Sequence, residues 1–362
     1  MHGFLVEMLE CPACHRALTW KVSKRRGDRI EEAEACCVAC GATYPVREGL
    51  GVFLTPDLPR KDLWEEVDSQ LTQYLCQHPE VERQLMDVPL DTLAPADQFY
   101  RALVLEERSD YAQAQAAVDA AQSRLYTPEY LACHERQINY VVECLAASDG
   151  PILDLASGRC QLVEVLARQL PRPIVATDFS PRVLRRDRRW LEFLGLYERI
   201  SLLAFDARRT PFKDGVVERL TTNLGLPNIE QPGTLLRELR RIVGGAFLAI
   251  SQFYPEDDET NAKALREAGL SALLFRRSTL EHFAAAGWEV KLANVCSGEA
   301  RPVPTGVVLE GAVIDAFPVA ETSLEWCVLV ARRDGIGKHP ATRLWANSNM
   351  KKLTESLICG IL

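Results

Sequence analysis

The amino-terminal part of the chain carries two Cys-x-x-Cys pairs. Cys11 and Cys14 form the first, in CPAC, and Cys37 and Cys40 form the second, in CVAC, with 22 residues between them. Each such turn directs two thiolates at one point, and two turns complete a tetrahedral zinc site. A redox pair is the alternative for a single motif, but two motifs at this spacing favour zinc. A site with four thiolates has no open position for water, so we expect a structural zinc ion.

A second stretch that could do chemistry is PILDLASGRC. Apolar residues lead to Asp154 and a tight turn, where a nucleotide-binding α/β domain has a loop of the form acid-x-Gly-x-Gly-x-Gly. Here only Gly158 is a glycine, and Ala156 and Cys160 stand in the other two places. Ala156 is harmless if its φ is negative, whereas Cys160 departs furthest because its side chain lies where the next helix begins. We expect the loop, with Ser157, to bind a cofactor still, with affinity lowered by Cys160.

The elements after residue 151 must position this loop. Strand and helix patterns alternate, which predicts a doubly wound sheet whose ligands bind at the carboxyl ends of the parallel strands. Acids end three successive strands. We expect Asp178 to accept the ribose hydroxyls, and Asp206, with Ala207, to lie at the adenine amino group. Phe179 is available to pack on the adenine ring, and Asp154 either fixes the loop or meets the ammonium group of the cofactor.

The missing glycines distinguish between two cofactors. A dinucleotide needs Gly-x-Gly-x-x-Gly for close approach to its pyrophosphate, whereas S-adenosylmethionine has no pyrophosphate. The pieces ILDLASGRC, ATDFSPRVL, FDARRTPFKDGVVERLTTNLGLPNI and LLRELRRIVGGAFLAIS resemble the class I S-adenosylmethionine-dependent methyltransferases, particularly the type that includes quinone-biosynthesis enzymes. The resemblance covers about 125–333. It implies an α/β fold with a seven-stranded Rossmann-like sheet, an antiparallel last strand and S-adenosylmethionine as cofactor.

The residues around the cysteines carry a resemblance of their own. MLECPACHRAL and CVACGATYPVREGLGVFL resemble the zinc ribbon of the small activator proteins that partner tRNA, rRNA and translation-factor methyltransferases. Tyr44, Pro45, Val46, Glu48 and Gly49 keep that pattern. The match covers about the first 55 residues and implies a ribbon fused ahead of a methyltransferase. Metal binding would supply the core that so short and polar a segment lacks.

The chain therefore divides into four parts. We expect a zinc ribbon at 1–56, a helical linker or lid at 57–124, the methyltransferase domain at 125–333, and a tail of unknown role at 334–362. Within the second part, apolar residues recur at helical spacing: Leu63, Val67, Leu71 and Leu75.

The segment before the sheet has two interpretations. As a linker it docks the ribbon; as a lid it covers the substrate pocket and brings Tyr126 and Tyr130 towards the cofactor. A helix from Pro128, with Thr127 as its N-cap, is predicted in either case.

The sequence says less about the methyl acceptor. The turn after the expected fourth strand reads NLGLPNI and not Asn/Asp-Pro-Pro-Tyr/Phe, which argues against methylation of exocyclic amino groups. Methyl transfer is an in-line displacement that requires positioning and, for some acceptors, proton removal. We place Asn223 in the cofactor site and name Tyr254 and Tyr126 as candidate catalytic residues, because a phenol could orient or deprotonate a hydroxyl. Packing is the alternative role for these rings.

A long apolar connection, SGEARPVPTGVVLEGAVIDAFPVAE, precedes the last strand. Because it must lie at the carboxyl ends of the parallel strands, we expect its apolar residues to wall the acceptor site. These residues are Val307, Val308, Leu309, Val313, Ile314 and Phe317. The alternative is that the connection pairs with another subunit and makes a homodimer.

Composition limits the classes of function. The net charge of −8 argues against broad affinity for nucleic acid, no apolar run reaches the ~20 residues needed to cross a bilayer, and no secretory signal is evident. We expect a cytoplasmic S-adenosylmethionine-dependent methyltransferase acting on a small organic acceptor. The alternatives are an RNA methyltransferase guided by the zinc ribbon and a non-catalytic methyltransferase-like binding protein.

Overall fold

The computed structural model describes residues 1–55, 57–58 and 63–333, with side chains described outside 63–69. The predicted tail at 334–362 lies outside the described residues, as do the side chains of Leu63 and Val67. Among the described residues, no helix is long and apolar enough to span a membrane.

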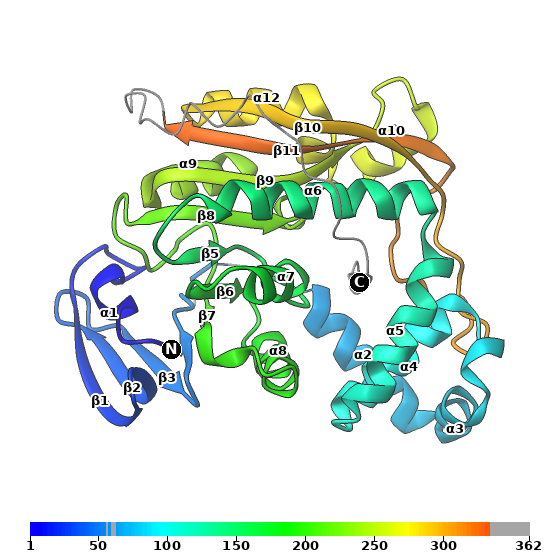
Figure 1. Cartoon of the computed structure of the whole chain (residues 1–362), viewed down its shortest axis with the longest axis horizontal. Helices are drawn as coiled ribbons and strands as arrows, with labels where there is room; N and C mark the ends of the chain where they lie inside the picture. The colour runs from blue at the N-terminus through cyan, green and yellow to red at the C-terminus, as the bar shows by residue number, and fades with distance from the viewer. Residues whose placement is uncertain (56, 59–62, 334–362) are drawn as a thin grey trace.

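A single mixed sheet of eleven strands forms the centre of the molecule, in the order β1-β2-β3-β4-β7-β6-β5-β8-β9-β11-β10 (Figure 1). The strands from the expected methyltransferase part are β5 (Ile152–Asp154), β6 (Ile174–Asp178), β7 (Ile200–Ala204), β8 (Val217–Asn223), β9 (Val243–Phe253), β10 (Trp288–Ala300) and β11 (Thr322–Arg333). Strands β5 to β9 are parallel, and β11 is antiparallel to both of its neighbours. The antiparallel last strand is as predicted, but the expected count of seven is too small for the whole sheet.

The amino-terminal segment supplies the additional strands. They are β1 (Leu18–Arg26), β2 (Arg29–Cys37), β3 (Thr43–Arg47) and β4 (Leu50–Val52), preceded by α1 (Leu5–Met8). Strand β4 pairs in parallel with β7, and the Phe53 N–H donates to the Ala204 carbonyl at 2.7 Å. The segment expected as a separate ribbon is thus continuous with the larger sheet, because β4 completes the open edge of β7.

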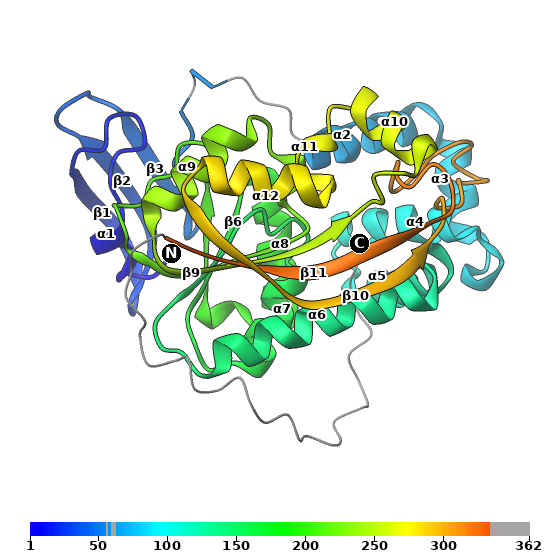
Figure 2. The same ribbon diagram turned by 90° about the horizontal axis from the view of Figure 1, so that it is seen from above.

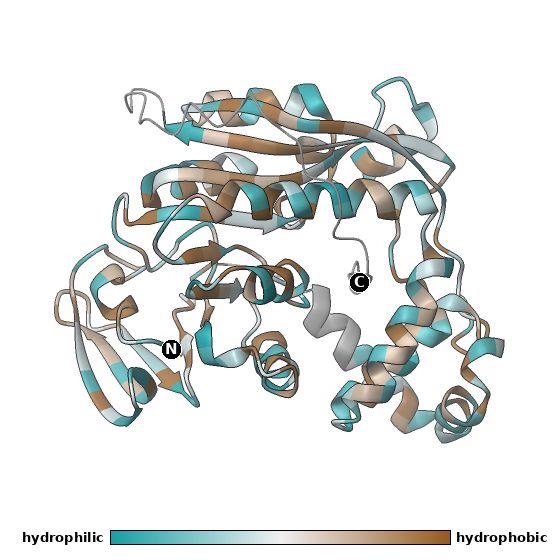
Figure 3. Cartoon of the chain, viewed as in Figure 1, coloured by the Kyte–Doolittle hydropathy of each residue, from teal (hydrophilic) through white to brown (hydrophobic). Residues whose placement is uncertain are grey.

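Helices cover both faces of the sheet (Figure 2). One face carries α6 (Pro128–Ala146), α7 (Gln161–Gln169) and α8 (Pro181–Phe193), and the other carries α9 (Pro232–Ile242), α10 (Glu259–Glu267), α11 (Ser271–Leu274) and α12 (Arg276–Ala285). Successive strand residues alternate between the two buried clusters, as Ile152 and Leu153 do. Figure 3 shows hydrophobic residues along the strands and mixed colouring on the covering helices, as expected for helices with one apolar face.

The segment between β4 and α6 is helical, as predicted. Its elements are α2 (Leu63–Gln77), α3 (Pro79–Asp87), the short 3-10 helix η1 (Leu90–Thr92), α4 (Pro95–Glu107) and α5 (Tyr111–Leu125). Helix α6 follows with the predicted cap, because the Thr127 hydroxyl accepts a hydrogen bond from the Tyr130 N–H at 3.1 Å. This cap fixes where α6 begins and so places its first turn beside the carboxyl ends of the strands.

Candidate functional site

The loop between β5 and α7 has a left-handed backbone at all three expected glycine positions. The φ angles are 52° at Ala156, 53° at Gly158 and 60° at Cys160. The sequence-based expectation that Ala156 fits this loop without strain required a negative φ, and the structure does not meet that requirement. Residues other than glycine rarely adopt left-handed backbone, because their Cβ atom then crowds the carbonyl oxygen. The loop keeps the conformation of a three-glycine loop although two of its residues carry side chains.

Asp178 connects this loop to the next strand. One carboxylate oxygen accepts hydrogen bonds from the Phe179 and Ser180 N–H groups, at 2.8 and 3.1 Å, and the other accepts from the Gly158 N–H at 3.1 Å. The residue lies at the end of β6 and stays partly exposed. Asp178 thus holds the loop against β6 from the position predicted for the ribose.

Asp154 lies beneath the loop. It is 1% exposed, and its Oδ1 accepts a hydrogen bond from the Thr221 hydroxyl of β8 at 2.7 Å. Burial raises the pKa of Asp154 to about 7. Of the two roles expected for this acid, the geometry favours fixing the loop, because the carboxylate faces the sheet. Thr221 is not among the residues predicted from the sequence.

Asp206 forms an ion pair with Arg208, a residue that is not among those predicted from the sequence. Arg208 donates to both carboxylate oxygens, with Nε at 3.0 Å and Nη2 at 2.7 Å, and its backbone N–H donates at 2.9 Å. Both side chains are buried. Asp206 and the adjacent Ala207 lie after β7 as expected, but the carboxylate predicted to meet adenine is already paired with a guanidinium.

Asn223, at the end of β8, links two helices. Its amide nitrogen donates to the Gln161 side chain of α7 at 2.6 Å, and its oxygen lies 2.9 Å from Nε2 of His134 on α6. Because an amide oxygen can only accept, this network assigns the proton to Nε2. Burial lowers the pKa of His134 to about 4, so the ring is neutral near pH 7. Asn223 therefore joins α7, which follows the loop between β5 and α7, to α6.

The tyrosines on the acceptor side gather around one acid. The rings of Tyr126 and Tyr130 stack with centroids 4.8 Å apart, and the Tyr126 hydroxyl donates to Asp315. Burial, and then the charge of Asp315, raise the pKa of Tyr126, Tyr130 and Tyr254. These phenols stay protonated near neutral pH, so they suit the orientation of an acceptor better than its deprotonation. Asp315 was not predicted from the sequence, although it is an acid directly flanked by the apolar residues Ile314 and Ala316.

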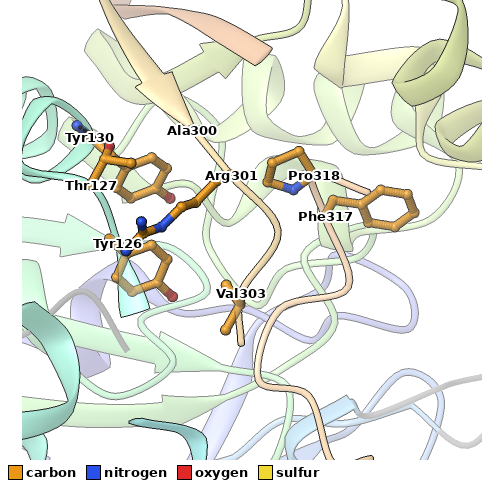
Figure 4. Close-up of a pocket in the computed structure, with 8 residues that line it drawn as sticks. All are labelled: Tyr126, Thr127, Tyr130, Ala300, Arg301, Val303, Phe317 and Pro318. Atoms are coloured by element: carbon orange, nitrogen blue, oxygen red, sulfur yellow. Dashed lines mark hydrogen bonds between the residues drawn. The ribbon is translucent and has the colours of Figure 1, made fainter. Parts of the chain in front are cut away.

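A pocket of about 10 Å³, enough for one water molecule, lies beside the tyrosine pair (Figure 4). It is lined by Tyr126, Thr127, Tyr130, Ala300, Arg301, Val303, Phe317 and Pro318. The expected apolar wall forms only in part. Leu309 is buried and Val308, Ile314 and Phe317 pack against the core, but Val307 and Val313 are 75% and 45% exposed.

Helix α4 contacts both halves of the site. Its Glu106 forms a buried ion pair with Arg159 of the loop between β5 and α7. Its Asp97 accepts hydrogen bonds from three successive N–H groups of the connection between β10 and β11, at 2.8–3.0 Å, and the Tyr100 hydroxyl donates to the Val313 carbonyl at 2.8 Å. This arrangement fits the lid interpretation of the helical segment better than that of a simple linker.

The four predicted metal ligands lie together at the far end of the sheet. The sulfur atoms of Cys11, Cys14, Cys37 and Cys40 are all within 4.8 Å of one another, and the closest pairs are 3.5 and 3.6 Å apart. A tetrahedral zinc ion with Zn–S bonds of about 2.3 Å separates its sulfurs by about 3.8 Å. The donor set and its spacing therefore fit zinc. Cys36, the substitute ligand suggested by the sequence, is not part of this group.

The part of the chain that includes the loop between β5 and α7 is similar in sequence to known proteins. Residues 153–249 match the family described as "Methyltransferase domain". A demethylmenaquinone methyltransferase from Thermus thermophilus is 35% identical over 106 residues, 29% of this chain and 47% of the relative. A ubiquinone/menaquinone biosynthesis C-methyltransferase from Coxiella burnetii is 26% identical over 116 residues, 31% of this chain and 46% of the relative. The chain thus spans about half the length of these relatives, and the similarity to the methyltransferase domain family is confined to 153–249.

Two solved structures align over a longer part of the chain. YcgJ from Bacillus subtilis aligns with a TM-score of 0.45 at 12% identity, over 56% of this chain and 100% of its own. A geranyl diphosphate C-methyltransferase from Streptomyces coelicolor aligns with a TM-score of 0.43 at 14% identity, over 62% of this chain and 84% of its own.

Proposed function

We propose that this protein is an S-adenosylmethionine-dependent methyltransferase that acts on a small organic acceptor. The observation that carries the proposal is the loop between β5 and α7, which has left-handed backbone at Ala156, Gly158 and Cys160 and is fastened to Asp178. This loop lies within the segment that matches the methyltransferase domain. Left-handed backbone of this kind is found where the chain approaches a ligand closely.

The cofactor would supply an electrophilic methyl group, and the residues of this chain would hold it. Asp178 would accept the ribose hydroxyls, and Ala156, Ser157 and Gly158 would pass beneath the methionyl part. The remaining cofactor contacts that we propose are Phe179, Asp206, Ala207 and Asn223. Tyr126 and Tyr254, protonated as argued above, would orient the acceptor.

A small acceptor is favoured over RNA. One relative is named for demethylmenaquinone and the other for ubiquinone and menaquinone biosynthesis, and quinones are small molecules. The ribbon strands are paired into the sheet at β7, which makes them an extension of the domain more than an independent RNA-guiding module.

We further propose that Cys11, Cys14, Cys37 and Cys40 hold a structural zinc ion, because their sulfur atoms have the spacing of a tetrathiolate site. All four ligand positions would belong to the protein, so the ion would take no part in methyl transfer. We place the protein in the cytoplasm, where its twelve cysteines would stay reduced.

One observation favours a second candidate, a methyltransferase-like protein without catalysis. Arg208 occupies both carboxylate oxygens of Asp206, and adenine recognition there would require that pair to open or to share its acceptors. A chain that had lost the cofactor could keep such a pair, because a buried ion pair satisfies both groups.

Titration calorimetry with S-adenosylmethionine and S-adenosylhomocysteine separates the two candidates. We expect both ligands to bind, and Asp178→Ala to weaken binding by about 1–3 kcal/mol through the loss of its hydrogen bonds. Asp178→Asn keeps the acceptor oxygen and should lose less. The absence of heat for both ligands, with a folded protein, would favour the non-catalytic candidate, and binding of a dinucleotide instead would overturn the cofactor assignment.

A further inference from the structure

Two thiols face each other where α6 packs against β10 (Figure 2). Cys133, in the second turn of α6, is buried, and Cys296, in β10, is half-buried. Their sulfur atoms are 3.2 Å apart, although the two residues are separated by 163 positions in the sequence. An S–S bond is about 2.05 Å long, so the sulfurs need to approach by only about 1.2 Å to form one.

The fold holds the helix and the strand together on both sides of this pair. Asn294 lies at a bulge of β10 with a left-handed φ of 55°, and its side-chain amide donates to the Arg136 carbonyl at 2.9 Å. The Gln137 side chain donates to the Asn294 carbonyl at 3.1 Å. Further along β10, a Cβ atom on Gly298 would lie 3.0 Å from the Cys133 sulfur, so the bare backbone there allows α6 to approach closely. The two sulfurs therefore meet through fixed elements of the fold.

The two thiols differ in exposure and in hydrogen bonding. Cys296 is the more exposed, and its sulfur accepts a hydrogen bond from Nε2 of Gln137 at 3.2 Å. A donor directed at sulfur favours the thiolate, which is the form that reacts with oxidants. Burial raises the pKa of Cys133, which therefore remains a thiol until its neighbour has reacted. These differences make Cys296 the thiol that is oxidised first and Cys133 the resolving thiol.

We propose that Cys133 and Cys296 are a redox-active pair, which hydrogen peroxide converts into a reversible disulfide between α6 and β10. The Cys296 sulfur attacks one peroxide oxygen, the O–O bond breaks, and the leaving hydroxide takes up the proton that the thiol has lost. The product is a sulfenic acid. The Cys133 sulfur then attacks the Cys296 sulfur, the S–O bond breaks, and hydroxide leaves with the Cys133 proton as water.

The reaction balances without any further reagent. Two thiols and one peroxide give one disulfide and two water molecules, and two electrons pass from sulfur to oxygen. A dithiol reverses the oxidation by thiol–disulfide exchange. In a reducing compartment the bond would be transient, as is usual for redox-sensing cysteines. While it lasts, it would tie to β10 the turn of α6 that carries His134.

Peptide mapping of the full chain tests the proposal. Reduced protein would be treated with hydrogen peroxide, blocked with N-ethylmaleimide and digested without reductant. We expect the free thiols of Cys133 and Cys296 to be lost together, and a linked peptide pair to appear that lacks the two thiol hydrogens. Dithiothreitol should abolish that pair and restore both thiols. An unchanged circular dichroism spectrum would show that the bond forms in the folded protein.

Three serine variants make the test specific. Cys133→Ser should leave Cys296 as a sulfenic acid, which dimedone labels, because the resolving thiol is missing. Cys296→Ser should leave the buried Cys133 unlabelled. Cys144→Ser is the matched control, since Cys144 lies on the same helix but near its other end. It should form the linked pair as readily as the parent.

Three outcomes would overturn the proposal. These are free thiols at both positions after peroxide treatment, linkage that appears only in protein unfolded in urea, and linkage of Cys133 or Cys296 chiefly to other cysteines. The inference does not rest on the proposed function. S-adenosylhomocysteine binding is measured on reduced protein, so failure of the methyltransferase assignment and failure of the redox pair are seen in separate experiments.

Discussion

The methyl group of Ala156 lies directly against the backbone of Gly225. A Cβ atom placed on Gly225 would lie 2.8 Å from the Cβ of Ala156 and 2.7 Å from the Thr222 hydroxyl oxygen. Gly225 has an ordinary φ of −76°, so space and not conformation excludes a side chain there. The alanine in the cofactor loop and the glycine after β8 therefore share one small volume.

This contact predicts energetic coupling between the two positions. Gly225→Ala should lower the free energy of unfolding by about 1–3 kcal/mol through overpacking. Ala156→Gly should raise it by up to about 1 kcal/mol, because glycine removes the strain of a left-handed φ at some cost in unfolded-state entropy. The double variant should recover part of the loss, with Thr222 limiting the recovery. Urea unfolding of all four proteins measures the cycle, and strict additivity would contradict the contact.

Cys160 allows the strain in the loop to be measured by itself. Cys160→Gly and Cys160→Ala both remove the buried thiol, but only glycine relieves the φ of 60°. We expect the glycine variant to be the more stable of the two by about 0.5–1 kcal/mol in urea unfolding. Because the Cys160 side chain is fully buried, the structure gives no reason for the lowered affinity expected from the sequence, and the glycine variant should bind S-adenosylhomocysteine about as tightly as the parent. A gain of about tenfold or more would mean that the native loop is poorly shaped for the cofactor.

Much of the fold could be predicted because its signals are local. The apolar runs that end in Asp154 and Asp178 mark strands of a parallel sheet, and the Thr-Pro pair at 127–128 marks the start of α6. The cysteine spacing is equally local, since each pair lies within one turn. Such features depend on the chemistry of neighbouring residues and need no knowledge of the tertiary arrangement.

The features that could not be predicted depend on residues distant in the sequence or on the sign of a backbone φ angle. Nothing in Leu50–Val52 indicates that this strand pairs with β7, because an open edge accepts any strand of suitable length. Alanine does not encode a positive φ, so the strain at Ala156 is a tertiary effect. The roles of Arg208 and Asp315 likewise depend on which side chains the fold brings to Asp206 and Tyr126.

The thiol cluster predicts one zinc ion per chain, measurable by elemental analysis of reduced protein. Cys14→Ser and Cys40→Ser should each lose most of the metal, because a hydroxyl is a far weaker zinc ligand than a thiolate. Cys36→Ser is the matched control: Cys36 adjoins Cys37 but lies outside the cluster, so zinc content should be unchanged. Equal metal loss in all three variants, or metal-free wild-type protein, would contradict the assignment.

The raised pKa of the buried Asp154 carboxyl predicts that the stability of the protein depends on pH. Its pKa is raised to about 7 by burial, whereas an unfolded aspartate titrates near 3.9. Between these values the folded state binds the extra proton, so the contribution of Asp154 to the free energy of unfolding falls as pH rises from about 4 to about 7.

Asp154→Asn keeps the oxygen that accepts from Thr221 and removes the titration. Relative to wild type, this variant should therefore gain about 2–4 kcal/mol between pH 4 and pH 8 in urea unfolding. Thr221→Val removes the hydrogen bond that favours the carboxylate, so it should extend the fall to higher pH. Parallel pH profiles for wild type and Asp154→Asn would show that Asp154 is ionised in the folded protein.

The pairing of β4 with β7 predicts that zinc stabilises the parallel strands β5 to β9 and not only the strands of the amino-terminal segment. Leu50 and Val52 lie in register with Leu202 and Ala204, and one buried cluster includes residues from both parts. Loss of zinc should loosen β4 and leave the edge of β7 unpaired.

Hydrogen exchange with mass spectrometry should then show reduced protection in peptides that cover β7 after chelation or in Cys40→Ser. Peptides from β9 and β11, further across the sheet, serve as the internal control and should change less. If β7 keeps its protection while β1 to β3 lose theirs, the ribbon unfolds on its own and the continuity of the sheet contributes little to stability.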